Sequence, residues 1–101
     1  MDPTENAPPP RTIELPEALD LPAAAGLAES LLKHVGEDLA IDASKVQRLG
    51  ASCLQVLLSA ARTWKAESTS LTLVDGSERF IDDLRLLGFT PETLFSGAQI
   101  Q

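Results

Sequence analysis

The feature that most constrains the fold is the run of residues 39–65, where an apolar segment, a polar loop and an amphipathic segment follow one another. Residues 39–41 are apolar and end at Asp42, which is typical of a short buried strand. After Gly50, apolar residues recur every three or four positions and predict a helix with one buried face, formed by Leu54, Leu57, Leu58, Ala61 and Trp64. A helix that begins after a strand leaves its first backbone N–H groups without acceptors. We therefore expect recognition near this junction, at Gly50, Ala51, Ser52 and Cys53.

The rest of the chain alternates between strand and helix patterns. Polar and apolar residues alternate at 12–15, residues 17–19 suggest a short edge segment, and residues 70–74 predict a last strand. Helices are expected at about 20–35 and from Ser77 to Gly88, followed by a short helical turn at 90–95. Strands separated by helical crossovers require a largely parallel sheet. The sequence thus predicts an α/β fold, with a central mixed or mostly parallel sheet of about four strands and helices mainly on one face.

The first of these helices has recognisable ends. Asp20 is expected to cap its N-terminus, with Pro22 in the first turn, and Gly36 is expected to end it in a left-handed conformation. His34 lies in the last turn, where the helix dipole favours a cation, so we do not expect it to bind a metal. The predicted buried stripe consists of Ala24, Leu27, Ala28, Leu31, Leu32 and Val35.

Composition narrows the class of protein. The 101 residues suffice for one domain, expected at 12–96 after a proline-rich, disordered lead-in at 1–11. The net charge of −7 disfavours nucleic acid and anionic membranes as partners. A single cysteine fits a reducing compartment, and we find neither a secretory signal nor an apolar run of about 20 residues. We expect a cytoplasmic protein without membrane insertion.

The sequence contains no recognisable catalytic constellation. GxGxxG and GxxxxGK[ST] are both missing, and one His with one Cys cannot form an ordinary zinc cluster. Cys53 is expected to be a small buried residue and not a nucleophile. Asp82 and Asp83 are expected to be solvated on a helix face. We therefore expect no enzymatic activity, no metal and no cofactor.

Residues 42–58, DASKVQRLGASCLQVLL, resemble the STAS family of anti-sigma-factor-antagonist-like domains, which commonly read D-L-S-x-V-x-x-I-D-S-S-G-L-x-x-L-L here. The matching positions are Asp42, Ser44, Val46, Leu49, Ser52, Leu54, Leu57 and Leu58. Weaker similarity extends over residues 12–95. It includes the pair Leu19-Asp20 before the first helix, and a last helix that ends in Gly88 and Phe89.

The resemblance implies a STAS-like fold, and in that family a serine or threonine at the start of the central helix is often phosphorylated by a partner kinase. The added charge at a helix N-terminus changes which surface can dock there. This chain departs from the pattern, since Gly50 replaces the family's Asp and Ala51 replaces the phosphoacceptor. Ser52 lies one position later, about 100° further around the helix, so it can be a substitute acceptor only if the register at the helix start shifts. The alternative is that Ser52 is an N-terminal capping or first-turn serine. The expected partner-binding residues are Asp20, Ser44, Gly50, Ala51, Ser52, Cys53 and Gln55.

The resemblance implies a non-catalytic regulatory protein that docks another protein in bacterial signal transduction, in a chemosensory, two-component or sigma-factor pathway. The partner would be a kinase, an anti-sigma factor or a chemosensory component, and the chain would be a monomer or weak dimer. The alternatives are a domain that senses a nucleotide or another small ligand, and an accessory subunit of a lipid-transport ATPase.

Overall fold

The computed structural model describes residues 11–95 and confirms the α/β class. The predicted lead-in up to residue 10 and the C-terminal end from residue 96 lie outside the described residues. The elements are β1 (Arg11–Glu14), β2 (Ala18–Leu19), the 3₁₀ helix η1 (Leu21–Ala23), α2 (Ala24–Leu32), β3 (Leu39–Ala43), β4 (Arg48–Leu49), α3 (Ala51–Ala66), β5 (Leu71–Gly76), α4 (Glu78–Leu86) and α5 (Pro91–Phe95). None of the helices in this part of the chain is long and apolar enough to cross a membrane.

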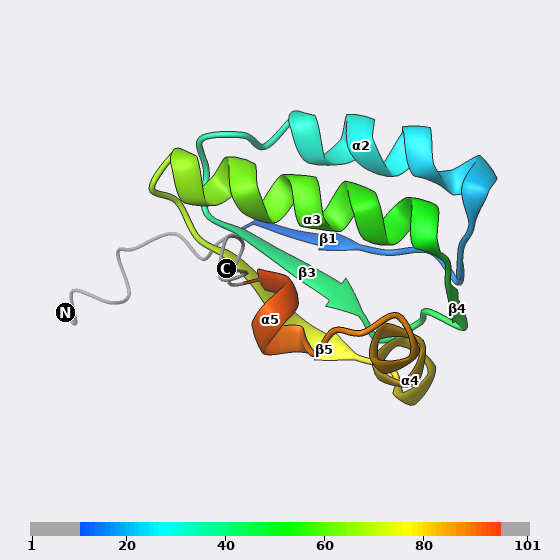
Figure 1. The fold of residues 1–101 in the computed structure, drawn as a ribbon. Coiled ribbons are helices and arrows are strands. Elements are labelled where there is room, and N and C mark those ends of the chain that lie inside the picture. The colour runs from blue at the N-terminus through cyan, green and yellow to red at the C-terminus, as the bar shows by residue number, and fades with distance from the viewer. Residues whose placement is uncertain (1–10, 96–101) are drawn as a thin grey trace, which may run out of the picture.

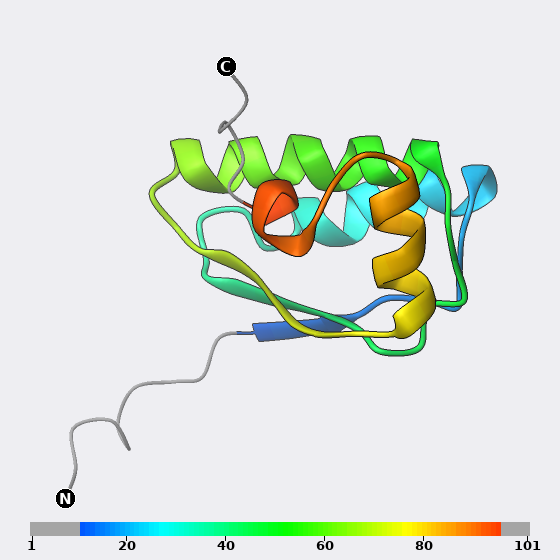
Figure 2. The same ribbon diagram turned by 60° about the horizontal axis from the view of Figure 1, so that its bottom comes forward.

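The strands form two small parallel sheets. One has three strands in the order β1-β3-β5, and the other pairs β2 with β4. The connection from β1 to β3 passes through α2 and that from β3 to β5 through α3, which is why these strands run parallel. Figure 2 shows the helices on one side of the three-stranded sheet, as predicted. The sequence did not predict β4, which lies within what looked like a polar loop.

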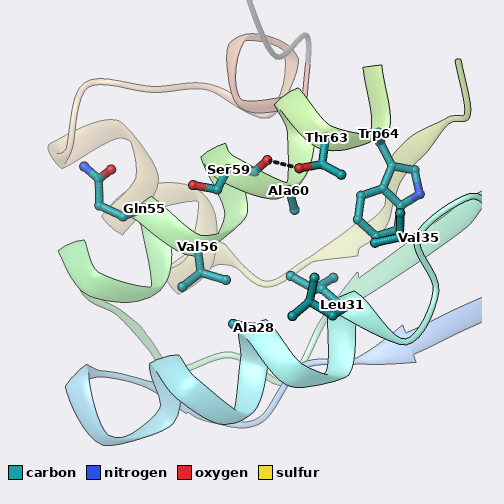
Figure 3. Close-up of a pocket in the computed structure, with 10 residues that line it drawn as sticks. Ala28, Leu31, Val35, Gln55, Val56, Ser59, Ala60, Thr63 and Trp64 are labelled. Atoms are coloured by element: carbon teal, nitrogen blue, oxygen red, sulfur yellow. Dashed lines mark hydrogen bonds between the residues drawn. The ribbon is translucent and has the colours of Figure 1, made fainter. Parts of the chain in front are cut away.

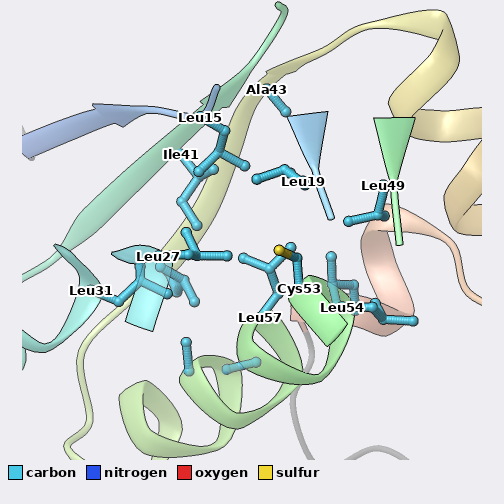
Figure 4. Packing of buried hydrophobic residues seen from close by; sticks show 14 of the residues in the cluster. Leu15, Leu19, Leu27, Leu31, Ile41, Ala43, Leu49, Cys53, Leu54 and Leu57 are labelled. Carbon is cyan, nitrogen blue, oxygen red and sulfur yellow. The ribbon is translucent and has the colours of Figure 1, made fainter. Parts of the chain in front are cut away.

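Helix α3 is central to the molecule, between α2 on one side and α4 and α5 on the other (Figure 1). Its buried residues are Cys53, Leu54, Leu57, Ala60, Ala61 and Trp64. They pack with Leu19 and Leu49 of the two-stranded sheet and with Ile41 of the three-stranded sheet (Figure 4). One aliphatic core therefore joins both sheets.

The predicted buried stripe of α2 is wrong at its C-terminal end. Leu27 and Leu31 are buried and Ala24 is partly buried, but Leu32 is 68% exposed and Val35 is 38% exposed. The helix ends at Leu32, and only one of its faces packs against the core. Leu32 lies off that face and Val35 lies beyond the end of the helix, so both remain exposed.

The predicted helix cap at Asp20 is also wrong. The chain first forms η1, at whose start Asp20 makes no side-chain cap. By contrast, Ser77 caps α4 as predicted, since its side chain accepts a hydrogen bond from Phe80 N at 3.0 Å. Gly36 has a φ value of +92°, the left-handed conformation expected there, although α2 already ends at Leu32. Gly88, expected to end the last helix, follows the C-cap residue Leu87 of α4 and has a φ value of +95°.

Candidate functional site

The start of α3 lies directly against the end of β2. Gly50 N donates to Leu19 O at 2.7 Å, and a Cβ on Gly50 would lie 3.4 Å from that same oxygen. Gly50 is the N-cap residue of α3 and has no side chain to accept a hydrogen bond from the first turn. The amides of Ala51 and Ser52, like those of any first helical turn, have no acceptor within the helix.

Asp20 is brought to this junction by the pairing of β2 with β4. Its carboxylate lies 3.3 Å from Arg48 Nη2, and its backbone oxygen accepts a hydrogen bond from Cys53 Sγ at 3.3 Å. The structure thus brings Asp20 to Gly50 and Cys53, although Asp20 lies about thirty positions before them in the sequence.

Cys53 does not present its side chain to a partner. It is fully buried among the core leucines (Figure 4). Burial, and then the nearby negative charge of Asp20, raise the pKa of its thiol, so the reactive thiolate is disfavoured. Our inclusion of Cys53 among the residues of a contact surface is corrected on this ground, whereas its role as a buried filler agrees with the structure.

The remaining residues of the first turn and a half are accessible to different degrees. Ala51 and Gln55 are exposed, and Ser52 and Gly50 are partly buried. The first turn contains no acidic side chain. We refer to Asp20, Gly50, Ala51, Ser52 and Gln55 as the α3 N-terminal surface.

Ser44 lies in a separate turn after β3. Its backbone N donates to Asp42 Oδ1 at 2.9 Å. Hydrogen bonds from the Ser44 side chain and then its backbone hold the pKa of Asp42 below its ordinary value. Within residues 11–95, no hydrogen bond or ion pair joins Ser44 to the α3 N-terminal surface.

One contact at the junction was not visible in the sequence. Leu49 N, just before Gly50, donates to Asp83 Oδ2 of α4 at 2.9 Å. The expectation that Asp82 and Asp83 are both solvated is therefore wrong for Asp83, which is partly buried and holds β4 against α4. No local signal could have revealed it, because the two partners lie 34 positions apart.

A groove of about 310 Å³ runs between α2 and α3. Ala28 and Leu31 of α2 face Val56, Ala60 and Trp64 of α3 across it (Figure 3). Gln55, Ser59 and Thr63 follow one another along one rim of α3. None of the described residues that line this groove is charged.

Within residues 11–95, no group of three or more His, Cys, Asp or Glu side chains is placed to hold a metal ion.

A family model described as "Mlab, STAS domain" matches residues 4–94, which is most of the chain. The chain belongs to the STAS domain family. STAS domains are generally regulatory and non-catalytic, and they typically bind other proteins. A comparison with curated proteins found no match.

Proposed function

We propose that this STAS domain is a non-catalytic regulator that binds another signalling protein through the α3 N-terminal surface, without a phosphorylation switch at the start of the helix. The observation that carries the proposal is the exposed methyl group of Ala51, at the first position of α3. Ala51 cannot accept a phosphate, and its small side chain leaves the helix N-terminus open to a partner.

The surroundings of Ala51 favour a preformed surface. Gly50 is fixed by its hydrogen bond to Leu19, and Asp20 is held by Arg48. A partner that docks here would order few side chains, and binding to a rigid surface loses less conformational entropy. We place the protein in the cytoplasm, in a chemosensory, two-component or sigma-factor pathway, because the sequence resembles free-standing domains of those systems. A transport ATPase is the other partner class that the resemblance implies.

The test uses a photo-crosslinking residue at position 51, with position 62 as the control, in cells that express the chain natively. Arg62 is exposed on nearly the same side of the same helix, about three turns further on. The crosslinked partner is identified by mass spectrometry, and its affinity is then measured with purified wild type, Ala51→Glu and Arg62→Glu.

We expect Ala51→Glu to weaken binding at least about tenfold, and Arg62→Glu to leave it unchanged. The fold should tolerate the substitution, because an acidic side chain in the first turn interacts favourably with the helix dipole. Equal crosslinking at both positions, or full affinity in Ala51→Glu, would show that the surface is wrong. A phosphate adduct on Ser52 in the intact mass, after incubation with the partner and ATP, would contradict the missing switch.

The groove between α2 and α3 supports a second candidate function, the sensing of a small uncharged ligand. Its apolar floor and polar rim have the character of ligand sites. Trp64, the one tryptophan of the chain, lines the groove, so its fluorescence would report an occupant directly. A ligand at a hundred times its Kd would add about 2.7 kcal/mol to the free energy of unfolding. Protein docking at Ala51, the first candidate function, does not require a ligand in this groove.

A further inference from the structure

Among residues 11–95, strand β1 is an edge strand with one side unpaired. Within this range it pairs only with β3, and Leu15 N donates across that pairing to Asp42 O at 2.9 Å. Successive residues of a strand direct their backbone groups to opposite sides. The N–H and C=O groups of Thr12 and Glu14 therefore face away from β3, along the unpaired edge, where another strand could bind them.

This edge forms one side of a groove whose other side is α2. The groove has a volume of about 430 Å³ and is lined by both elements, with Leu15 and Leu27 among its buried residues. Gly26 leaves the α2 side open, because a Cβ at that position would meet no atom within 4 Å. The apolar floor could accept alternate side chains of an added strand.

The groove carries the cationic side chain of Lys33 at the end nearest the start of β1. Lys33 lines it there beside His34, and within residues 11–95 Lys33 makes no ion pair. The neighbouring acid, Glu37, is compensated, since its Oε1 lies 3.2 Å from Arg11 Nε and 3.4 Å from His34 Nδ1. In a chain of net charge −7, this end is suited to an incoming carboxylate.

We propose that the groove between β1 and α2 binds an extended C-terminal peptide of a partner protein, which adds to β1 as an antiparallel strand. Backbone hydrogen bonds to Thr12 and Glu14 supply affinity, and alternate apolar side chains enter the groove. The terminal carboxylate lies at Lys33, near the N-terminal end of β1. A peptide that ends there runs opposite to β1, which fixes the antiparallel direction.

This site is separate from the α3 N-terminal surface, so the two proposals fail independently. We would select binders from a displayed library of random heptapeptides with free C-termini, using wild-type protein. The selected peptides are then measured against Gly26→Leu, which fills the groove, and Ala25→Leu, which adds the same side chain at the adjacent exposed position of α2 outside the groove.

We expect peptides with apolar residues at alternate positions to be enriched. Gly26→Leu should lower the affinity for these peptides at least about tenfold, and Ala25→Leu should change it less than about twofold. C-terminal amidation of the peptide, or Lys33→Glu, should also weaken binding. The substitution Gly26→Leu replaces glycine in a helix by a better helix former, so loss of folding would not explain the effect.

Hydrogen exchange separates strand addition from simple filling of the groove. Binding should slow exchange at the amides of Thr12 and Glu14. Thr12→Pro, which removes a donor on the free edge and places the proline ring there, should weaken peptide binding. The proposal is overturned if no peptide is enriched, if Gly26→Leu and Ala25→Leu bind equally, or if those two amides stay unprotected. Self-association of the wild type that Gly26→Leu abolishes, without peptide binding, would overturn it in favour of a second copy.

Discussion

The turn formed by Asp42 and Ser44 at the end of β3 stabilises the charged form of one carboxylate. Asp42 accepts hydrogen bonds from Ser44, and these lower its pKa in the folded state. In an unfolded chain the same carboxyl group has its ordinary, higher pKa. The stabilisation is therefore present above the unfolded pKa and is lost as the pH falls through the folded pKa.

Ser44→Ala should raise the pKa of Asp42 toward its ordinary value, because the Ser44 side chain is the largest cause of the shift. The measurement is a ¹³C NMR titration of the Asp42 carboxyl carbon in both proteins. The part of acid stability that depends on Asp42 should shrink in the variant. Ser59→Ala, an exposed serine in α3, is the control and should leave the titration unchanged. Identical titration midpoints in wild type and Ser44→Ala would contradict the assignment.

Individual residues of the candidate site differ in how far the sequence could predict them. The exposure of Gln55 follows from the periodicity of α3, because it falls outside the apolar stripe. Ala51 has the spacing of the stripe, three positions before Leu54, and is nevertheless exposed. Cys53 lies at the same junction, yet its side chain points into the core. Only the packing of β2 and β4 against the helix decides which side of the first turn is covered.

At the scale of elements, α2 illustrates how periodicity overestimates burial. Leu31 and Leu32 are both apolar and both fall within a stripe of helical spacing, but their exposed fractions are 3% and 68%. The apolar residues at helical spacing in α2 cover a wide sector of the helix, which includes both leucines. The face of α2 that is buried in the structure is narrower and, of these two, includes only Leu31. The sequence does not specify how many neighbours an outer helix has.

Leu31→Ala should destabilise the protein by about 2–5 kcal/mol, as is usual for a buried leucine, because it removes core contacts and leaves a cavity. Leu32→Ala changes a neighbouring side chain of the same type and should alter the free energy of unfolding by no more than about 0.5 kcal/mol. Urea denaturation followed by far-UV circular dichroism measures both. Similar losses in the two variants would mean that Leu32 is covered, for example by a second molecule.

Predictions succeeded where their cause is local in the sequence and failed where it is not. Ser77 caps α4 through a residue three positions away, and Gly36 adopts its left-handed conformation, four residues after the end of α2, through its own backbone. Strand β4 depends on pairing with β2 and on the carboxylate of Asp83, both distant in sequence. Asp20 was predicted from local sequence as a helix cap, but its carboxylate pairs with Arg48, 28 positions away.

At the scale of the whole molecule, α3 joins two sheets that share no strand. Leu19 of β2 and Leu49 of β4 belong to the same core cluster as Leu39 and Ile41 of β3. Helix α3 contributes to this cluster along its length, from Cys53 to Trp64. Neither sheet could remain folded if α3 left, because each buries its apolar side chains against the helix or its neighbours.

Leu19→Ala should therefore lower the stability of every region equally, although it lies in the smaller sheet. Leu19 is fully buried, and its truncation should cost about 2–5 kcal/mol. Trp64 fluorescence reports on the far end of α3, and far-UV circular dichroism reports on all helices and strands. Because one core holds both sheets, the urea midpoints measured by fluorescence and by circular dichroism should coincide in the wild type. Both midpoints should shift together in the variant. A circular dichroism transition that moves while the Trp64 transition stays in place would mean that the two sheets unfold separately, and α3 would then be no more than a connection between them.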